Sequence, residues 1–326
     1  MAAIENILVV VDPGAQRQPA LERAAWLAKR SGATLELFIC DYDQYFGCEH
    51  LYDSESLVNA RGQLIARHAR HLRDQARRLA EQGIEVSVDA RLDHPLHEAI
   101  VRKVQDAGSD IVFKDTHYHA PLGRALFSNT DWSLLRSCPV PLWLVKAQPM
   151  PGRPRIMAAV DPLHEHDKFA ELDHRMLEAA GALRSAIDGE LHLVHVYEIA
   201  PALAKSTATP ISMPLRDIAE ALKKQHSDAV FDLADAHALE RGAVHICQGR
   251  TQQVLIRFMR QMNADVVVLG AVSRSALHRE VLGSTAEQVL DHFPCDMLIV
   301  KPAGVAAAAR SVRSNERSHT RGGAHD

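Results

Sequence analysis

The chain of 326 residues contains two similar halves, and this repeat limits what it can fold into. The segment 110–146 aligns with 265–301 without a gap. Both segments run from an Asp through an apolar stretch, a polar loop and a proline to a final β-branched stretch. The starts match too, since 6–13 corresponds to 155–162. The repeat predicts two domains of the same fold, each at the usual scale of about 150 residues.

Short apolar segments alternate with amphipathic helical patterns in both halves. This order is typical of parallel strands joined by helical crossovers. It predicts two tandem five-stranded, parallel-sheet, doubly wound α/β domains of Rossmann-like architecture. Expected strands are 7–11, 35–40, 84–88, 111–113 and 142–146, then 156–160, 191–197, 244–247, 266–269 and 298–301. Expected helices are 21–31, 56–81 and 97–105, then 167–186, 214–240 and 251–262.

The domain boundaries follow from composition. The first domain is expected at 1–146 and the second at 155–302. Between them, 147–154 holds three prolines and reads as a stiff linker, while 303–326 lacks an apolar period and reads as a disordered tail. The last strand of each half would be an exposed edge, which is a template for pairing. We therefore predict that the halves pack as an internal pseudo-dimer, with further homo-oligomers left open.

Composition excludes several function classes. No uninterrupted apolar run approaches the roughly 20 residues that cross a bilayer, so no membrane partner is expected. The five cysteines form no CxxC pair and the N-terminus has no signal-peptide pattern, which favours the reducing cytoplasm. A net charge of −4 gives no broad basic field for a nucleic-acid partner.

A loop with small residues follows the fourth expected strand of the second half. It starts at Gly270, continues through Ser273 and reaches Gly283, Ser284 and Thr285 before a helical pattern. In an open α/β sheet, ligands bind outside the carboxyl ends of the strands, where loop N–H groups meet anions. Glycine permits close approach of a phosphate and the hydroxyls add donors. The alternative is that both glycines only permit tight turns.

The spacing Gly270-x2-Ser273-x9-Gly283-Ser284 resembles the G-x2-G-x9-G-[ST] ATP loop of universal stress proteins, and the resemblance extends over nearly the whole chain to Lys301. It implies a tandem member with an adenine nucleotide alpha hydrolase-like fold and a role in stress response. Ser273 departs from the motif, because a glycine stands there in the family. The resemblance implies adenine contacts at Asp161 and Val196 and phosphate contacts at Gly270, Ser273, Gly283, Ser284 and Thr285.

The first half departs further from this motif. Asp115 replaces the first glycine and Tyr118 the second. A carboxylate at a phosphate site repels a triphosphate, so we expect the first half to have a structural role or a different ligand. We also align Cys40-Asp41 with His195-Val196.

Other polar residues have two interpretations each. Asp12 and Asp161 both precede a proline, and we favour a turn role for Asp12 and a base contact for Asp161. A zinc site drawn from His117, His119, the Cys48-x-His50 pair, His68 and His71 is an alternative to solvated or hydrogen-bonding histidines. His68 and His71 share a helix with several arginines, so we expect them on a solvated face.

No nucleophile–base pairing or adenylate-transfer signature is found in the sequence. We therefore favour a non-catalytic sensor or regulator that binds ATP or another adenine nucleotide in the second domain, where occupancy alters either domain packing or the surface for a regulatory protein partner. One alternative is a slow ATPase, or an enzyme that phosphorylates itself at Ser284 or Thr285. The other is a ligand-free structural or interaction protein.

Overall fold

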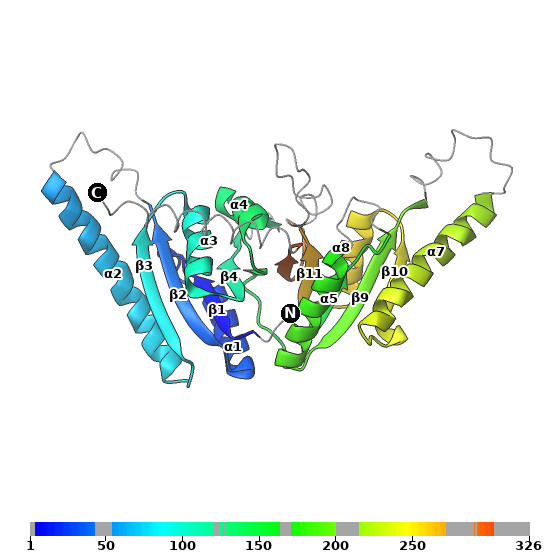
Figure 1. Ribbon diagram of the computed structural model, residues 1–326, viewed down its shortest axis with the longest axis horizontal. Helices are drawn as coiled ribbons and strands as arrows, with labels where there is room; N and C mark the ends of the chain where they lie inside the picture. Colours follow the sequence, from blue (N-terminus) through cyan, green and yellow to red (C-terminus); the bar gives the residue numbers. More distant parts are fainter. Residues whose placement is uncertain are drawn as a thin grey trace, which may run out of the picture. The chain divides into compact units, whose positions relative to one another are not determined.

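A computed structural model describes residues 4–42, 54–119, 124–126, 128–163, 171–199, 215–271, 290 and 292–302 (Figure 1). The chain divides into two compact units. Ala2–His119 with Leu126–Pro149 forms the unit that we call the first domain, and Met150–Pro302 makes up most of the second.

The first domain has a parallel sheet in the order β7-β4-β1-β2-β3. Two short strands occupy the region expected to be only a polar loop, which the alternating apolar pattern did not reveal. Up to Pro149, the strands of the chain are β1 Asn6–Val10, β2 Thr34–Asp41, β3 Val86–Leu92, β4 Ile111–Asp115, β5 His117–His119, β6 Arg124–Leu126 and β7 Leu142–Val145. The helices are α1 Pro19–Ser31, α2 Ser54–Ala80, α3 Leu96–Ala107 and α4 Asn129–Ser137.

The second domain repeats this arrangement with a parallel sheet in the order β12-β11-β8-β9-β10. The doubly wound α/β fold expected from the sequence is confirmed. Its strands are β8 Arg155–Ala159, β9 Glu190–Tyr197, β10 Val244–Gln248, β11 Val266–Gly270 and β12 Asp296–Val300. Its helices are α5 Glu171–Ile187, α7 Leu215–Ala236 and α8 Thr251–Gln261, with a 3-10 turn at Arg241–Ala243.

The central strands are apolar on both faces because they lie inside a helix–sheet–helix sandwich. Phe113 and Trp143 are fully buried in the first domain and stack with ring centroids 4.8 Å apart. Met157 and Leu193 are equally buried in the second. Burying a side chain of this size stabilises the fold by about 1.5–3 kcal/mol.

In both copies, an aspartate side chain accepts hydrogen bonds from backbone N–H groups at the start of the first strand. The Asp110 carboxylate accepts hydrogen bonds from the backbone N–H groups of Glu5 and Asn6, both at 2.9 Å. The Asp265 carboxylate accepts from the N–H of Arg155 at 2.8 Å. These aspartates begin the aligned segments, so the repeat includes side-chain contacts as well as apolar pattern.

Within the part of the chain that the structure describes, no helix is both long and apolar enough to cross a bilayer. Pairing of the two halves through their last strands stays a prediction.

Candidate functional site

Three predicted residues lie at the carboxyl ends of neighbouring strands. Asp161 follows β8, Val196 is in β9 and Gly270 ends β11. β8 lies between β9 and β11, with Ala159 opposite Val194 and Ala158 opposite Val268. The chain winds from β8 outward to β10 and then returns to β11 on the other side of β8. This reversal is a topological switch point, where open α/β sheets bind ligands.

The other predicted phosphate contacts lie outside the described residues. These are Ser273, Gly283, Ser284 and Thr285. The described part of the site is therefore its base side together with the first residue of the loop.

The peptide between Val160 and Asp161 is held on both sides. Its carbonyl oxygen lies 3.0 Å from Nδ1 of His195, which must donate because a carbonyl only accepts. Its N–H donates to the Asp173 carboxylate at 3.1 Å. A peptide unit is planar, so these two bonds fix its orientation. Asp161 is nearly buried and Asp173 almost fully so.

A buried histidine pair continues from this peptide into α7. Nε2 of His195 lies 2.8 Å from Nδ1 of His226, and each residue is 1% exposed. In the tautomer with one proton on Nδ1 of His195, Nε2 of that ring can only accept, and Nδ1 of His226 is then the donor. The His226 ring stacks on Tyr197 at 4.6 Å, and burial raises the pKa of that phenol. Sequence reasoning singled out His195 but missed His226, because no local pattern links residues on different elements.

Gly270 has a packing role of its own. A Cβ added there would lie 2.6 Å from Cδ2 of Leu172 and 2.9 Å from Sδ of Met176, both in α5. Gly270 does not have a positive φ. The glycine is therefore required by the close approach of α5 to β11, which neither the phosphate nor the tight-turn interpretation had anticipated.

In the first domain, the residue aligned with Gly270 caps a helix. Oδ1 of Asp115 accepts from the N–H of Ala20 at 2.6 Å, at the start of α1. Burial raises the pKa of the Asp115 carboxyl to about 6, although the hydrogen bond from Ala20 partly opposes this. A helix N-terminus favours an anion, and here the chain supplies its own.

The start of α4 is occupied in the same way. Ser128 and Asp131 form a capping box, in which the N–H of Asp131 donates to the Ser128 hydroxyl and the Asp131 carboxylate accepts from the N–H of Ser128. Nζ of Lys114 lies 2.7 Å from the fully buried Asp131 carboxylate. Ser128 aligns with Gly283. In the first domain, side chains therefore occupy the helix start that corresponds to the expected phosphate site of the second domain.

The strand ladders correct one alignment between the halves. Val10 pairs with Phe38, and the matching Ala159 pairs with Val194. Ile39-Cys40, not Cys40-Asp41, therefore stands in place of His195-Val196. The sequence comparison was wrong by one residue because the loops before the second strands differ in length.

The turn role expected for Asp12 is confirmed. Its carboxylate accepts from the N–H of Gly14 at 2.8 Å, as in an Asx turn.

The solvated position expected for His68 is wrong. His68 is buried and its Nε2 lies 2.9 Å from the Asp41 carboxylate. Cys48, His50 and the side chains of His117 and His119 lie outside what the structure describes. The described residues contain no group of three or more His, Cys, Asp or Glu arranged to hold a metal ion.

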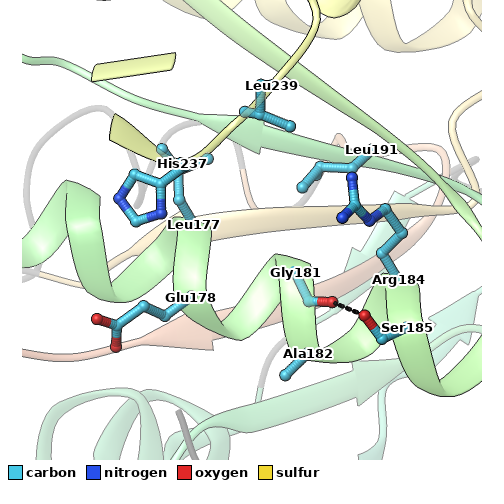
Figure 2. A pocket seen from close by; sticks show the side chains of 9 residues that line it. All are labelled: Leu177, Glu178, Gly181, Ala182, Arg184, Ser185, Leu191, His237 and Leu239. Atoms are coloured by element: carbon cyan, nitrogen blue, oxygen red, sulfur yellow. Dashed lines mark hydrogen bonds between the residues drawn. The ribbon is translucent and has the colours of Figure 1, made fainter. Parts of the chain in front are cut away.

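A surface cavity of about 350 Å³ lies elsewhere in the second domain (Figure 2). Leu177 and Gly181 of α5, Leu191 near the start of β9 and His237 after α7 contribute to its lining. This places it toward the amino ends of the strands, away from Asp161 and Gly270. None of the predicted site residues lines it.

Comparison with known proteins agrees with the duplicated architecture. The Universal stress protein family matches residues 3–146 and again residues 152–301. The chain belongs to the universal stress protein family.

Its relatives include full-length tandem members of this family. The chain is 32% identical over 320 residues to Universal stress protein E of Photorhabdus laumondii, covering 96% of this chain and 100% of the relative. It is 31% identical over 306 residues to Universal stress protein E of Escherichia coli K12, covering 93% and 95%. Among solved structures, the functionally unknown protein PA1789 of Pseudomonas aeruginosa matches with a TM-score of 0.73 and 25% identity, over 96% of this chain and 98% of that one.

Proposed function

We propose that this universal stress protein binds ATP or another adenine nucleotide in its second domain and acts as a sensor or regulator of the stress response in the cytoplasm. The observation that carries the proposal is the position of Asp161, Val196 and Gly270 on three adjacent strand ends at a topological switch point. The base would lie against Asp161 and Val196, and the loop from Gly270 through Ser273 to Gly283, Ser284 and Thr285 would bind phosphates.

Side chains of the first domain occupy the positions where a nucleotide would bind, which supports a single nucleotide per chain, bound in the second domain. Asp115 caps α1, while Ser128 and Asp131 cap α4, so both helix starts already carry side-chain acceptors. A bound triphosphate would have to displace these acceptors and approach their charge. Occupancy of the second domain would then alter the surface that a regulatory protein partner meets.

The test is identification and titration of the ligand. Small molecules released by denaturation are identified by mass spectrometry, and ATP is then titrated calorimetrically into the wild type and Gly283→Val. We expect one site per chain and at least about a tenfold weaker affinity in the variant, equivalent to about 1.4 kcal/mol. Gly152→Val is the control, because a Cβ added at Gly152 meets nothing within 4 Å.

Each outcome separates the candidate functions. Absence of both released nucleotide and titration heat in the wild type would contradict the proposal and favour a ligand-free structural protein. Time-dependent phosphate release that Gly283→Val abolishes would favour the slow ATPase. Gly270 is unsuitable for this test, because its substitution also disturbs Leu172.

A further inference from the structure

We propose that His195 and His226 are positioning residues for the base side of the nucleotide site. The inference rests on the proposed function and assigns to this buried pair the role of holding the peptide that leads into Asp161. The pair thereby links nucleotide affinity to helix α7.

Hydrogen bonds connect His226, His195 and Val160 in a row. Nδ1 of His195 donates to the carbonyl of Val160, and in the tautomer with one proton on that nitrogen, Nε2 of His195 accepts from Nδ1 of His226. The hydrogen-bonded row therefore runs from α7 through β9 to the residue that follows β8. We call His226, His195 and Val160 the histidine relay.

The histidine relay holds the peptide that leads into Asp161. Val160 and Asp161 share one planar peptide, whose carbonyl bonds to His195 and whose N–H bonds to Asp173. His195 is also the neighbour of Val196 in β9. Both proposed base contacts are thus adjacent in sequence to residues of the relay, and a small change in this peptide would move them relative to each other.

Both histidines of the relay are buried. His195 and His226 are each 1% exposed, and their rings lie 5.0 Å apart between centroids. Side chains packed this tightly reorient little, so the hydrogen bonds have a fixed geometry. Buried hydrogen bonds of this kind are costly to break because water does not replace the lost partner.

The first domain provides an internal comparison. Its ladder register places Ile39 where the second domain has His195. Ile39 is fully buried and its side chain has no donor, so it offers no equivalent hydrogen bond to Val11. The relay is therefore found in the domain that we propose binds the nucleotide, and the general fold does not require it.

The experiment separates the base side from the phosphate side. Adenosine, which has the base without phosphates, and ATP are both titrated calorimetrically into wild-type protein, His195→Leu and His195→Asn. The Asn amide places its N–H near the position of Nδ1, so it keeps a donor for the Val160 carbonyl while losing contact with His226. Ile39→Val is the matched control for a core substitution at the equivalent position of the first domain.

We expect His195→Leu to weaken adenosine and ATP by the same factor, about tenfold, with the number of sites unchanged. His195→Asn should restore most of the affinity. Gly283→Val should instead weaken ATP and leave adenosine unchanged, because it alters only the phosphate side. Ile39→Val should change neither affinity.

A purely structural role would give a different pattern. It would lower thermal stability or the number of sites without changing affinity, and that result would overturn the inference. Equal affinities in wild type and His195→Leu would also overturn it. If His195→Leu does not fold, His226→Phe keeps the stack on Tyr197 while removing the donor, and unchanged adenosine affinity in that variant overturns the inference as well. If the wild-type protein binds neither adenosine nor ATP, that result contradicts both the proposed function and this role of the histidines.

Discussion

The first domain has the carboxyl group of Asp115 at the end of β4, where the second domain has Gly270 at the end of β11. Burial raises the pKa of Asp115 to about 6, above the ordinary value of 3.8 expected in the unfolded chain. The folded state therefore binds a proton more readily than the unfolded state between these two values. The contribution of this group to stability is present at low pH and is lost as the pH rises through about 6.

Asp115→Asn tests this assignment at the residue scale. The amide oxygen still accepts from the Ala20 N–H, while the buried charge is removed. We expect the free energy of unfolding at pH 7.5 to rise by about 1–2 kcal/mol, after allowing for the buried amide N–H. The gain should shrink toward pH 4.5 in urea denaturation. Asp228→Asn, at an exposed position on α7, should show no such trend; a gain that is the same at both pH values would contradict the assignment.

At the scale of elements, the contact between α5 and β11 depends on the missing side chain of Gly270. A Cβ there would meet Leu172, which is fully buried in α5. Gly270→Ala should therefore destabilise the protein by about 1–3 kcal/mol through overpacking. The added methyl and the Leu172 side chain compete for the same space, so the two positions should be energetically coupled.

A double-mutant cycle measures this coupling. Leu172→Ala alone should cost about 2–5 kcal/mol. The double variant Gly270→Ala/Leu172→Ala should cost less than the sum of the single variants, by about 1 kcal/mol or more. Gly181→Ala is the control within α5, because a Cβ at Gly181 meets nothing within 4 Å. Strict additivity would show that the two elements do not make this contact.

For the whole molecule, the described residues place all three imidazole–imidazole hydrogen bonds in the second domain. The pairs are His174–His237 at 2.9 Å, His192–His245 at 3.1 Å and His195–His226 at 2.8 Å. Burial lowers the pKa values of His192, His237 and His245 below the ordinary 6.5. For these groups the unfolded state binds more protons, so their contribution to stability is present above pH 6.5 and is lost as the pH falls.

The two domains should therefore respond differently to acid. Between pH 7.5 and 5.5 we expect hydrogen exchange, corrected for the intrinsic pH dependence, to accelerate in β9 and β10. Strands β1 and β4 should be unchanged or better protected, because Asp115 takes up its proton. The variant His192→Asn/His245→Asn should lose part of the response in β9 and β10. An equal change in both domains would refute this prediction.

The strand segments were predictable because apolar alternation is a local property. The segment 191–197, for example, was placed to within a residue of β9 Glu190–Tyr197. The register between strands was less accessible, and the alignment of Cys40-Asp41 with His195-Val196 was wrong by one residue. Loop length is not encoded in strand pattern, so only the ladder reveals which residues stand opposite each other.

The sequence by itself determined that the chain has two doubly wound halves, and it placed the candidate site after the fourth strand of the second half. Both follow from periodicity and short motifs, which involve residues close together in the chain. Only the tertiary structure revealed that Asp115 caps the helix start at Ala20, 95 residues away, and that His226 supports His195 across 31 residues. Such contacts depend on how helices pack on a sheet, and that packing brings distant residues together with no matching signal in either segment.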